Sequence, residues 1–336
     1  MPLCIKNIRQ MFLILIFLTA TDTAWAVNLK IATLSPQGSM WMVKMQEGAE
    51  EVVQKTNNRV TFKFYPGGVM GEDETVLKLI RAGQLHGGAM VGGSLARFFP
   101  ANQIYAQPLK FSQIEEVDYV RKYMDQYIEN GHNENGFVTF GLMGAGFAYI
   151  MSQNPVETVE DLRTQKVWVL PDNKSSQESL QAFGVTPIPL SLSDVLTGLQ
   201  TGLINTVATS PVGAITLQWH DQIKYVTNLP LIYIYGVLAV DKKRFQKISK
   251  EDRQIVHQVM TEACRQIDIK NRQDNIKATE TLKKRGITFI SPSKKALTDW
   301  LELGKQASQR MVESGALPKD VVEQLDNLLA NFHSNQ

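Results

Sequence analysis

Hydrophobic residues recur along this chain with two spacings, one typical of strands and the other typical of helices. The pattern predicts a strand over residues 29–34, a helix over 40–56 and a second strand over 59–65. A turn is expected at Pro66-Gly67-Gly68, and a further strand at Gly87–Val91. Strands that alternate with helices in this way indicate an α/β architecture.

Three acidic residues, Glu72, Asp73 and Glu74, follow Gly71 and open a helix that we expect to end at Gly83. Carboxylates in the first turn of a helix complement the partial positive charge of its N-terminus. A calcium loop, by contrast, spreads its ligands over about a dozen residues. We therefore interpret the three carboxylates as helix-start residues and expect no metal site.

The same alternation continues in the second half of the chain. Apolar runs predict strands over residues 137–142, 147–152, 167–170, 204–208 and 231–240, with helices over 175–183 and 191–201. Thr158 and Asp161 have the spacing of a capping pair at the start of another helix.

One predicted helix is much longer than the others. Ser249 and Asp252 cap it, its apolar face recurs from Ile255 to Ile267, and no proline or glycine interrupts it before Arg285. At a rise of 1.5 Å per residue, its roughly 36 residues would extend about 54 Å. Because that exceeds one small domain, we expect the helix to run across two lobes.

The first 26 residues have the three parts of a cleaved export signal. Lys6 and Arg9 are basic, Met11–Ala20 is almost entirely apolar, and Ala24-Trp25-Ala26 has the small-x-small pattern of a cleavage site. The apolar run is too short for a transmembrane helix, which needs about 20 residues. We expect cleavage after Ala26 and a periplasmic mature chain.

Composition and charge exclude several classes of partner. The chain has 35 basic and 33 acidic residues and a net charge of +2, which argues against nucleic acid or an anionic membrane as the main partner. Cys4 would leave with the signal, so Cys264 would remain without a disulfide partner. The longest later apolar stretch, Leu229–Val240, fits a buried strand better than a membrane span, so no stable membrane insertion is expected.

Motifs of catalysis and cofactor binding are missing from the sequence. It contains no phosphate-binding loop, no dinucleotide-binding glycine motif and no paired zinc ligands. Gly92–Ala96 resembles a nucleophile elbow around Ser94, but alanine replaces the last glycine. His220 has no nucleophile beside it, and we interpret it as a surface or loop histidine. We expect no cofactor and no enzyme; an exported hydrolase is the minor alternative.

Five segments together carry a resemblance to a known family. They are Phe64–Gly71, Leu79–Gly83, Pro155–Arg163, Gly184–Leu190 and Asp194–Gly202. In this order and spacing the chain resembles the solute-binding proteins of the tripartite ATP-independent periplasmic (TRAP) transporters, in the dicarboxylate-type (DctP) branch. The resemblance covers nearly all of residues 27–336.

The resemblance implies a two-lobed periplasmic binding protein fold of the α/β class. Hinge strands would join the lobes, a long C-terminal helix would span both, and the ligand would lie in the cleft between them. Residues 27–146 and 237–275 would form lobe I, and residues 147–236 and 276–336 would form lobe II with the C-terminal helices. The loaded protein would deliver its solute to TRAP membrane permease subunits driven by a sodium gradient. A periplasmic protein that presents its ligand to a sensor kinase would have the same sequence features, so that alternative stays open.

The chain departs from the family pattern where relatives bind a carboxylate. The family's strand usually carries an arginine that clamps this group, but here Trp168 occupies the position. Charge-assisted hydrogen bonds from such an arginine contribute about 1.5 to 3 kcal/mol each, whereas an indole has one N–H donor and no charge. The basic residue that relatives often carry near the hinge is also missing from Gly144–Tyr149, and Asn205–Pro211 lacks the family's glutamate and asparagine.

Aromatic and polar residues near the expected cleft supply candidate ligand contacts. The candidate walls are Trp168, Tyr149, Trp41, Tyr233 and Tyr235; the polar candidates are Ser94, Asp172, Asn173, Thr209 and Ser210; the candidate cations are Arg97 and Lys44. Apart from Trp168, each aromatic residue is more often part of a core, and Arg97 is more often a solvated loop charge. We predict an organic solute with a substantial apolar or aromatic part, whose acid group, if present, is bound differently than in relatives.

Overall fold

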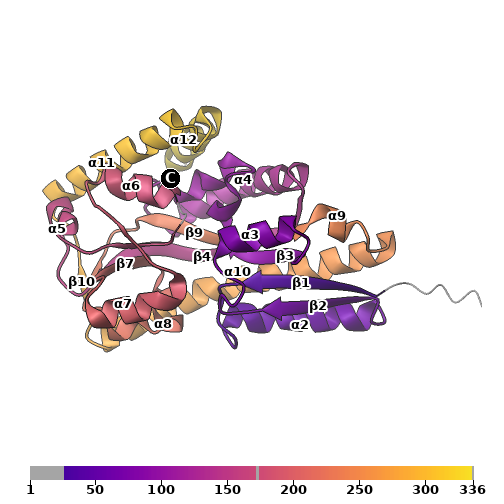
Figure 1. Cartoon of the computed structure of the whole chain (residues 1–336). Coiled ribbons are helices and arrows are strands. Elements are labelled where there is room, and N and C mark those ends of the chain that lie inside the picture. The colour runs from indigo at the N-terminus through magenta and orange to yellow at the C-terminus, as the bar shows by residue number, and fades with distance from the viewer. Residues whose placement is uncertain (1–25, 172–173, 335–336) are drawn as a thin grey trace, which may run out of the picture.

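The computed structural model describes residues 26–171 and 174–334. Its helices and strands form two lobes, each built from strands covered by helices, which are joined by long strands and one long helix (Figure 1). The two-lobed α/β architecture expected from the sequence is thereby confirmed. The expected export signal lies almost entirely outside the described residues.

Most strands overlap the predicted segments, but the short strands β6, β8 and β10 were not predicted. They are β1 (Val27–Thr33), β2 (Val60–Tyr65), β3 (Gly87–Val91), β4 (Phe137–Ser152), β5 (Trp168–Val169), β6 (Ile188–Pro189), β7 (Thr206–Thr209), β8 (Tyr225–Thr227), β9 (Ile232–Asp241) and β10 (Thr288–Ile290).

The helices cover both faces of the strands. They are α2 (Met40–Lys55), α3 (Asp73–Arg81), α4 (Ile114–Glu134), α5 (Val159–Arg163), α6 (Lys174–Ala182), α7 (Val195–Thr201), α8 (Pro211–Thr216), α9 (Lys242–Phe245), α10 (Lys250–Lys284), α11 (Lys294–Glu313) and α12 (Lys319–Ser334). Short 3-10 helices lie at η1 (Gly92–Leu95), η2 (Pro100–Ala106), η3 (Leu192–Asp194) and η4 (Trp219–Asp221).

The main sheet has the strand order β10-β8-β4-β9-β3-β1-β2, and β7 also pairs with β4. In the first lobe β1 pairs in parallel with β2 and β3, while β9 runs antiparallel to β3 and β4. The far half of β4 pairs with β7 and β8 of the second lobe. The strand β4 therefore passes from one lobe into the other, as expected for a hinge strand.

The two strands predicted over 137–142 and 147–152 are in fact one continuous strand. The register of β4 against β9 shifts twice, once between Thr139 and Leu142 and again between Gly144 and Gly146. Gly141 and Gly146 have positive φ angles of 103° and 95°, which a residue with a side chain rarely adopts. These glycines form bulges that bend the strand without ending it, so the two predicted strands are continuous.

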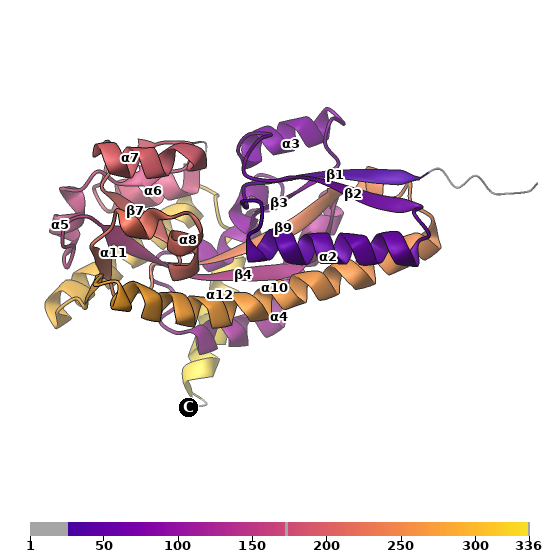
Figure 2. The ribbon, with the colours of Figure 1, turned by 90° about the horizontal axis from the view of Figure 1, so that it is seen from below.

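The long helix α10 confirms the sequence-based prediction. Ser249 caps it by accepting a hydrogen bond from the Asp252 N–H at 3.0 Å, and it continues for 35 residues to Lys284. It packs on α2 in the first lobe and on α8 in the second, and Figure 2 shows it running beneath both lobes.

Side chains of α10 also hold the bulged part of β4. Asp268 Oδ1 accepts the Gly144 N–H at 2.7 Å, and Asn271 Nδ2 donates to the Gly144 carbonyl at 2.8 Å. Asn275 Nδ2 donates to the Ala145 carbonyl at 2.9 Å. The backbone groups that a bulge leaves unpaired in the sheet thus find partners on the helix that spans both lobes.

The helix α4 is an element that the sequence reasoning did not identify. Glu116 fixes its start by accepting the backbone N–H groups of Ser112 at 2.6 Å and Gln113 at 3.4 Å. The last helix, α12, packs on α4, whereas α11 packs on α6 in the second lobe.

The residue boundaries of the two lobes stay a prediction.

The buried hydrophobic side chains of the described residues form four clusters, two in each lobe. In the first lobe one cluster lies under α2 and α10 and the other under α3, α4 and α12. In the second lobe one lies under α5, α6 and α11 and the other under α7 and α8. Cys264 lies in the α2–α10 cluster, where burial raises the pKa of its thiol to about 12. Within residues 26–171 and 174–334, no helix is both long and apolar enough to cross a membrane.

Candidate functional site

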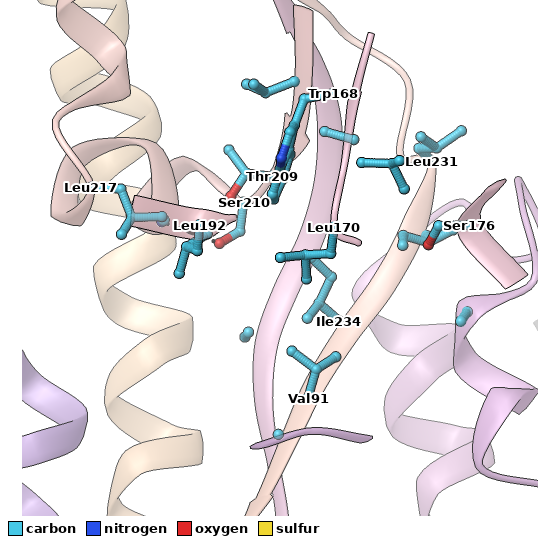
Figure 3. Close-up of a pocket in the computed structure, with 18 of the residues that line it drawn as sticks. Val91, Trp168, Leu170, Ser176, Leu192, Thr209, Ser210, Leu217, Leu231 and Ile234 are labelled. Atoms are coloured by element: carbon cyan, nitrogen blue, oxygen red, sulfur yellow. Dashed lines mark hydrogen bonds between the residues drawn. The ribbon is translucent and has the colours of Figure 1, made fainter. Parts of the chain in front are cut away.

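A cavity of about 410 Å³ lies between the two lobes (Figure 3). The first lobe contributes the segment from Thr33 to Trp41, the end of β3 and part of β9. The second lobe contributes β5, the junction of β7 and α8, and Leu192. The volume is within the range of small-molecule sites, and the ends of parallel strands β1 and β3 are where α/β proteins usually bind ligands.

Most side chains around the cavity are hydrophobic. Figure 3 shows Leu170, Leu192, Leu217, Leu231 and Ile234 around the open space. Among the described residues that line it there is no lysine, arginine or histidine, and Asp73 is the only one with a carboxylate. An acid held in this cavity would therefore lack a positive partner within the described part of the chain.

Trp168 forms part of the cavity wall from strand β5. Its Nε1–H donates to the Leu190 carbonyl at 2.9 Å, so this donor is already used within the protein. Its ring packs edge-on against Trp219, with 5.2 Å between centroids, and Trp219 is only 2% exposed. Trp168 thus offers a ligand an aromatic surface held in a fixed orientation.

Trp41 is the aromatic wall on the first-lobe side, in the first turn of α2. Ser39 caps this helix by accepting the Met42 N–H at 3.4 Å. The Trp41 ring covers Gly236 of β9, where an added Cβ would lie 2.7 Å from two ring carbons. A glycine at position 236 therefore leaves the space that the indole occupies.

Thr209 and Ser210 bring hydroxyl groups to the cavity at the end of β7 (Figure 3). The Ser210 Oγ also accepts the Gly213 N–H at 3.2 Å and so caps α8, in which Pro211 occupies the first turn. The strand-end position expected for both residues is where the structure places them.

The remaining aromatic candidates pack into the cores of the lobes, and Tyr235 is the one of these three that also lines the cavity. Tyr235 lines it but is 4% exposed, and its hydroxyl donates to the Asn102 carbonyl at 2.9 Å. Tyr233 packs edge-on against Tyr105 in the first-lobe core. Tyr149 packs against the second-lobe core, and burial raises the pKa of its hydroxyl.

The candidate cations are paired within the first lobe. Arg97 Nη1 lies 2.7 Å from Glu74 Oε2, and Lys44 Nζ lies 2.6 Å from Glu47 Oε2. Neither side chain lines the cavity. Asp172 and Asn173 lie outside the described residues.

The residues considered for catalysis have structural partners. Ser94 lies in the 3-10 helix η1, and its Oγ donates a hydrogen bond to Asp73 Oδ2 at 2.6 Å. The interpretation of His220 as a surface residue is wrong as to exposure, because its side chain is 8% exposed. Its Nδ1 lies 3.2 Å from the Ala214 carbonyl, which ties η4 to α8.

Asp73 is the cavity residue that sequence reasoning missed. It lies in the first turn of α3, as predicted, but its carboxylate accepts hydrogen bonds from the Val91 N–H at 3.1 Å and the Ser94 hydroxyl. The acidic residues after Gly71 predict a helix start, but they do not predict hydrogen bonds to Val91 and Ser94, which lie 18 and 21 residues later. No group of three or more potential metal ligands occurs among the described residues.

Comparisons with known proteins place the chain in a family. The profile of the family described as "Bacterial extracellular solute-binding protein, family 7" (DctP) matches residues 31–314. A 26% identical match to the uncharacterized protein YiiZ of Salmonella typhimurium covers 62% of this chain and 64% of that protein. The C4-dicarboxylate-binding periplasmic protein DctP of Rhodobacter capsulatus is 21% identical over 79% of this chain and 80% of its own.

Solved structures share the fold. A TRAP periplasmic solute-binding protein from Ralstonia eutropha, with bound (S)-2-acetolactate, has a TM-score of 0.83 at 17% identity and covers 90% of this chain and 99% of its own. One from Haemophilus influenzae, with bound L-gulonate, has a TM-score of 0.81 at 19% identity and the same coverage. At such identities the likeness shows the fold alone.

Proposed function

The chain belongs to the bacterial extracellular solute-binding proteins of family 7, and we propose that it serves a sodium-coupled TRAP transporter whose solute has a substantial apolar or aromatic part. Members of this family are periplasmic, non-enzymatic components of transport systems. On this proposal the protein encloses its solute between the lobes and delivers it unchanged to the TRAP membrane permease subunits.

The observation that carries the proposal is the aromatic wall at position 168. Trp168 lines an apolar cavity, in the place where the family resemblance implies a carboxylate-binding arginine. The Ralstonia and Haemophilus proteins have acids in their structures, and an acid buried without a positive partner costs several kcal/mol. The apolar lining favours a ligand that gains most of its binding energy from burial of its own hydrophobic surface, at roughly 25 cal/mol per Å².

The same geometry assigns roles to the candidate residues. Trp168 and Trp41 would face the apolar body of the solute from opposite lobes, so that both contacts form only when the lobes close. Thr209 and Ser210 would meet a polar group at the end of β7. Closure would then depend on the ligand, because the ligand supplies the contact between the two walls.

Thermal unfolding with a ligand panel tests the function. The panel contains aliphatic dicarboxylates, hexuronates, aromatic acids and neutral aromatic compounds, and a ligand that binds only the folded protein raises Tm as its concentration exceeds Kd. We expect the aromatic members to stabilise the protein most. Stabilisation by C4 dicarboxylates or hexuronates alone would contradict the proposal. Incubation followed by mass spectrometry should return each bound compound unchanged.

A further inference from the structure

Asp73 places a carboxylate in the wall of the inter-lobe cavity. Its side chain lines the cavity and is only 8% exposed. Both recorded hydrogen bonds of the carboxylate fall on one oxygen, Oδ2, which accepts the Val91 N–H at 3.1 Å and the Ser94 hydroxyl at 2.6 Å. The other oxygen, Oδ1, has no hydrogen-bond partner within the described part of the chain.

Among the described side chains, no cation forms an ion pair with Asp73. Its neighbours Glu72 and Glu74 carry the same charge, and the nearby cation Arg97 is paired with Glu74 at 2.7 Å. Burial raises the pKa of Asp73 to about 6. The hydrogen bonds from Ser94 and Val91 oppose this shift but are smaller in effect. The carboxyl is therefore ionised above neutral pH and attracts donors and cations, while it repels a carboxylate.

The first turn of α3 favours a carboxylate at Asp73, but the two hydrogen bonds that Asp73 accepts do not by themselves require a charge. The two bonds that hold the turn between β3 and η1 need only one acceptor oxygen, which an asparagine would supply as well. An aspartate at this largely buried position adds an ionised group that costs stability, while Oδ1 stays accessible and has no hydrogen-bond partner among the described residues. Groups of this kind are typical of ligand sites, where the ligand supplies the missing hydrogen bond.

We propose that the solute presents a hydroxyl or ammonium group to Asp73 Oδ1, so that the cavity selects apolar alcohols or amines over carboxylic acids with the same body. This rests on the proposed function and deepens it by naming the polar group of the solute. Ser94 is a positioning residue in this scheme, because its hydroxyl fixes the carboxylate without touching the ligand.

Matched compounds test the proposal. Each set has one apolar body, either benzyl, indolylethyl or cyclohexylmethyl, carrying a carboxylate, a hydroxyl or a primary ammonium group. Binding is measured by thermal shift and calorimetry at pH 7.5 for the wild type, Asp73→Asn and Glu74→Gln. The last variant removes the same charge one residue away, from a side chain that does not line the cavity.

The expected result is that alcohols or amines bind the wild type more tightly than the matching acids. Asp73→Asn should lower amine affinity roughly ten- to a hundredfold, the loss of one hydrogen bond to a charged group, and Glu74→Gln should have little effect. Amine binding to the wild type should also weaken as pH falls below about 6, because Asp73 becomes protonated while the amine stays charged. The Ser94→Ala variant, which keeps Asp73 itself, should lose part of the amine preference.

Contrary outcomes separate the two ideas. If the acids bind best, or if Asp73→Asn keeps the wild-type preference, the role of Asp73 is refuted while the apolar cleft stands. If no compound of any set stabilises the wild type, the apolar-solute function itself is refuted, and this inference with it.

Discussion

Glu72 of the first lobe accepts a hydrogen bond from the backbone N–H of Leu192 in the second lobe, with 2.8 Å between Oε1 and the nitrogen. Glu72 precedes α3, and Leu192 is the first residue of η3. The other carboxylate oxygen, Oε2, is buried without a partner among the described residues. The bond joins the two lobes in this structure, so we expect Glu72 to act as a latch that favours the closed arrangement.

We expect Glu72→Ala to weaken ligand binding by roughly fivefold, because it removes one partly exposed inter-lobe hydrogen bond worth about 1 kcal/mol. Glu72→Gln keeps an acceptor for Leu192 and should retain most of the affinity. Calorimetry with the compound that stabilises the wild type most measures the effect. Equal affinities for the wild type and Glu72→Ala would show that the latch contributes nothing to closure.

Several parts of the fold were predictable because their signals are local. Ser249 and Thr158 cap their helices by accepting hydrogen bonds from N–H groups three residues later. Sequence spacing alone therefore revealed both helix starts. The start of α4 was missed because Gln113, its cap residue, is not among the residue types that usually cap helices. The sequence predicted two strands where β4 is one, since a local pattern with glycines does not distinguish a bulge within a strand from a break between strands.

The candidate site was predictable only where family position or a strand end located it, as for Trp168 and Thr209. Asp73 was interpreted from its helix alone. Its place in the cavity depends on hydrogen bonds from Val91 at the end of β3 and from Ser94 in η1, which are distant in sequence. Glu72 and Leu192 are 120 residues apart, so their contact depends on how the lobes close and not on any local pattern.

Removing the charge of Asp73 should stabilise the protein without ligand. The pKa of Asp73 is raised from 3.8 to about 6 in the folded state, so the folded state holds its proton more tightly than the unfolded chain. This contribution to stability is fully present below pH 3.8 and is lost as pH rises through about 6. At pH 8 we expect Asp73→Asn to be more stable than the wild type, by about 3 kcal/mol at most.

Urea unfolding at pH 4 and pH 8 measures this difference, with Glu74→Gln as the matched control. The gain for Asp73→Asn should be larger at pH 8 than at pH 4, and Glu74→Gln should show little change between the two. A loss of stability at pH 8 would mean that the charged carboxylate holds the β3–η1 turn more strongly than the amide does.

Trp168 and Trp219 touch each other but should respond differently to truncation. Trp168→Ala removes a half-buried wall of the cavity, so the protein should still unfold cooperatively while affinity for aromatic compounds falls at least tenfold. Trp219→Ala removes a fully buried ring and should cost about 3 to 5 kcal/mol of stability. Urea unfolding and calorimetry on both variants separate the roles; loss of folding in Trp168→Ala would assign that residue to the core.

Trp168→Arg extends the same test by placing a cation where the family resemblance implies one. We expect this variant to gain affinity for small carboxylic acids and to lose affinity for neutral aromatic compounds, because the charge-assisted bonds of a guanidinium replace an apolar surface. Trp168→Phe serves as the control that keeps a ring but removes the N–H bond to Leu190. A gain in acid binding by both variants would indicate that loosening of β5, and not the charge, is responsible.

Gly236 controls the position of Trp41 at the opposite wall. A Cβ at residue 236 would lie 2.7 Å from Trp41 ring carbons and 3.2 Å from the Met90 carbonyl, so we expect Gly236→Ala to displace the indole. We expect a shift in tryptophan fluorescence and roughly tenfold weaker binding of the largest aromatic ligands, with less effect on small ones. Gly93→Ala is the matched control, because a Cβ there meets only Gln103 Oε1 at 3.7 Å. If both variants bind all ligands as the wild type does, Trp41 does not form a wall of the ligand site, and only the second-lobe side of the cavity selects the solute.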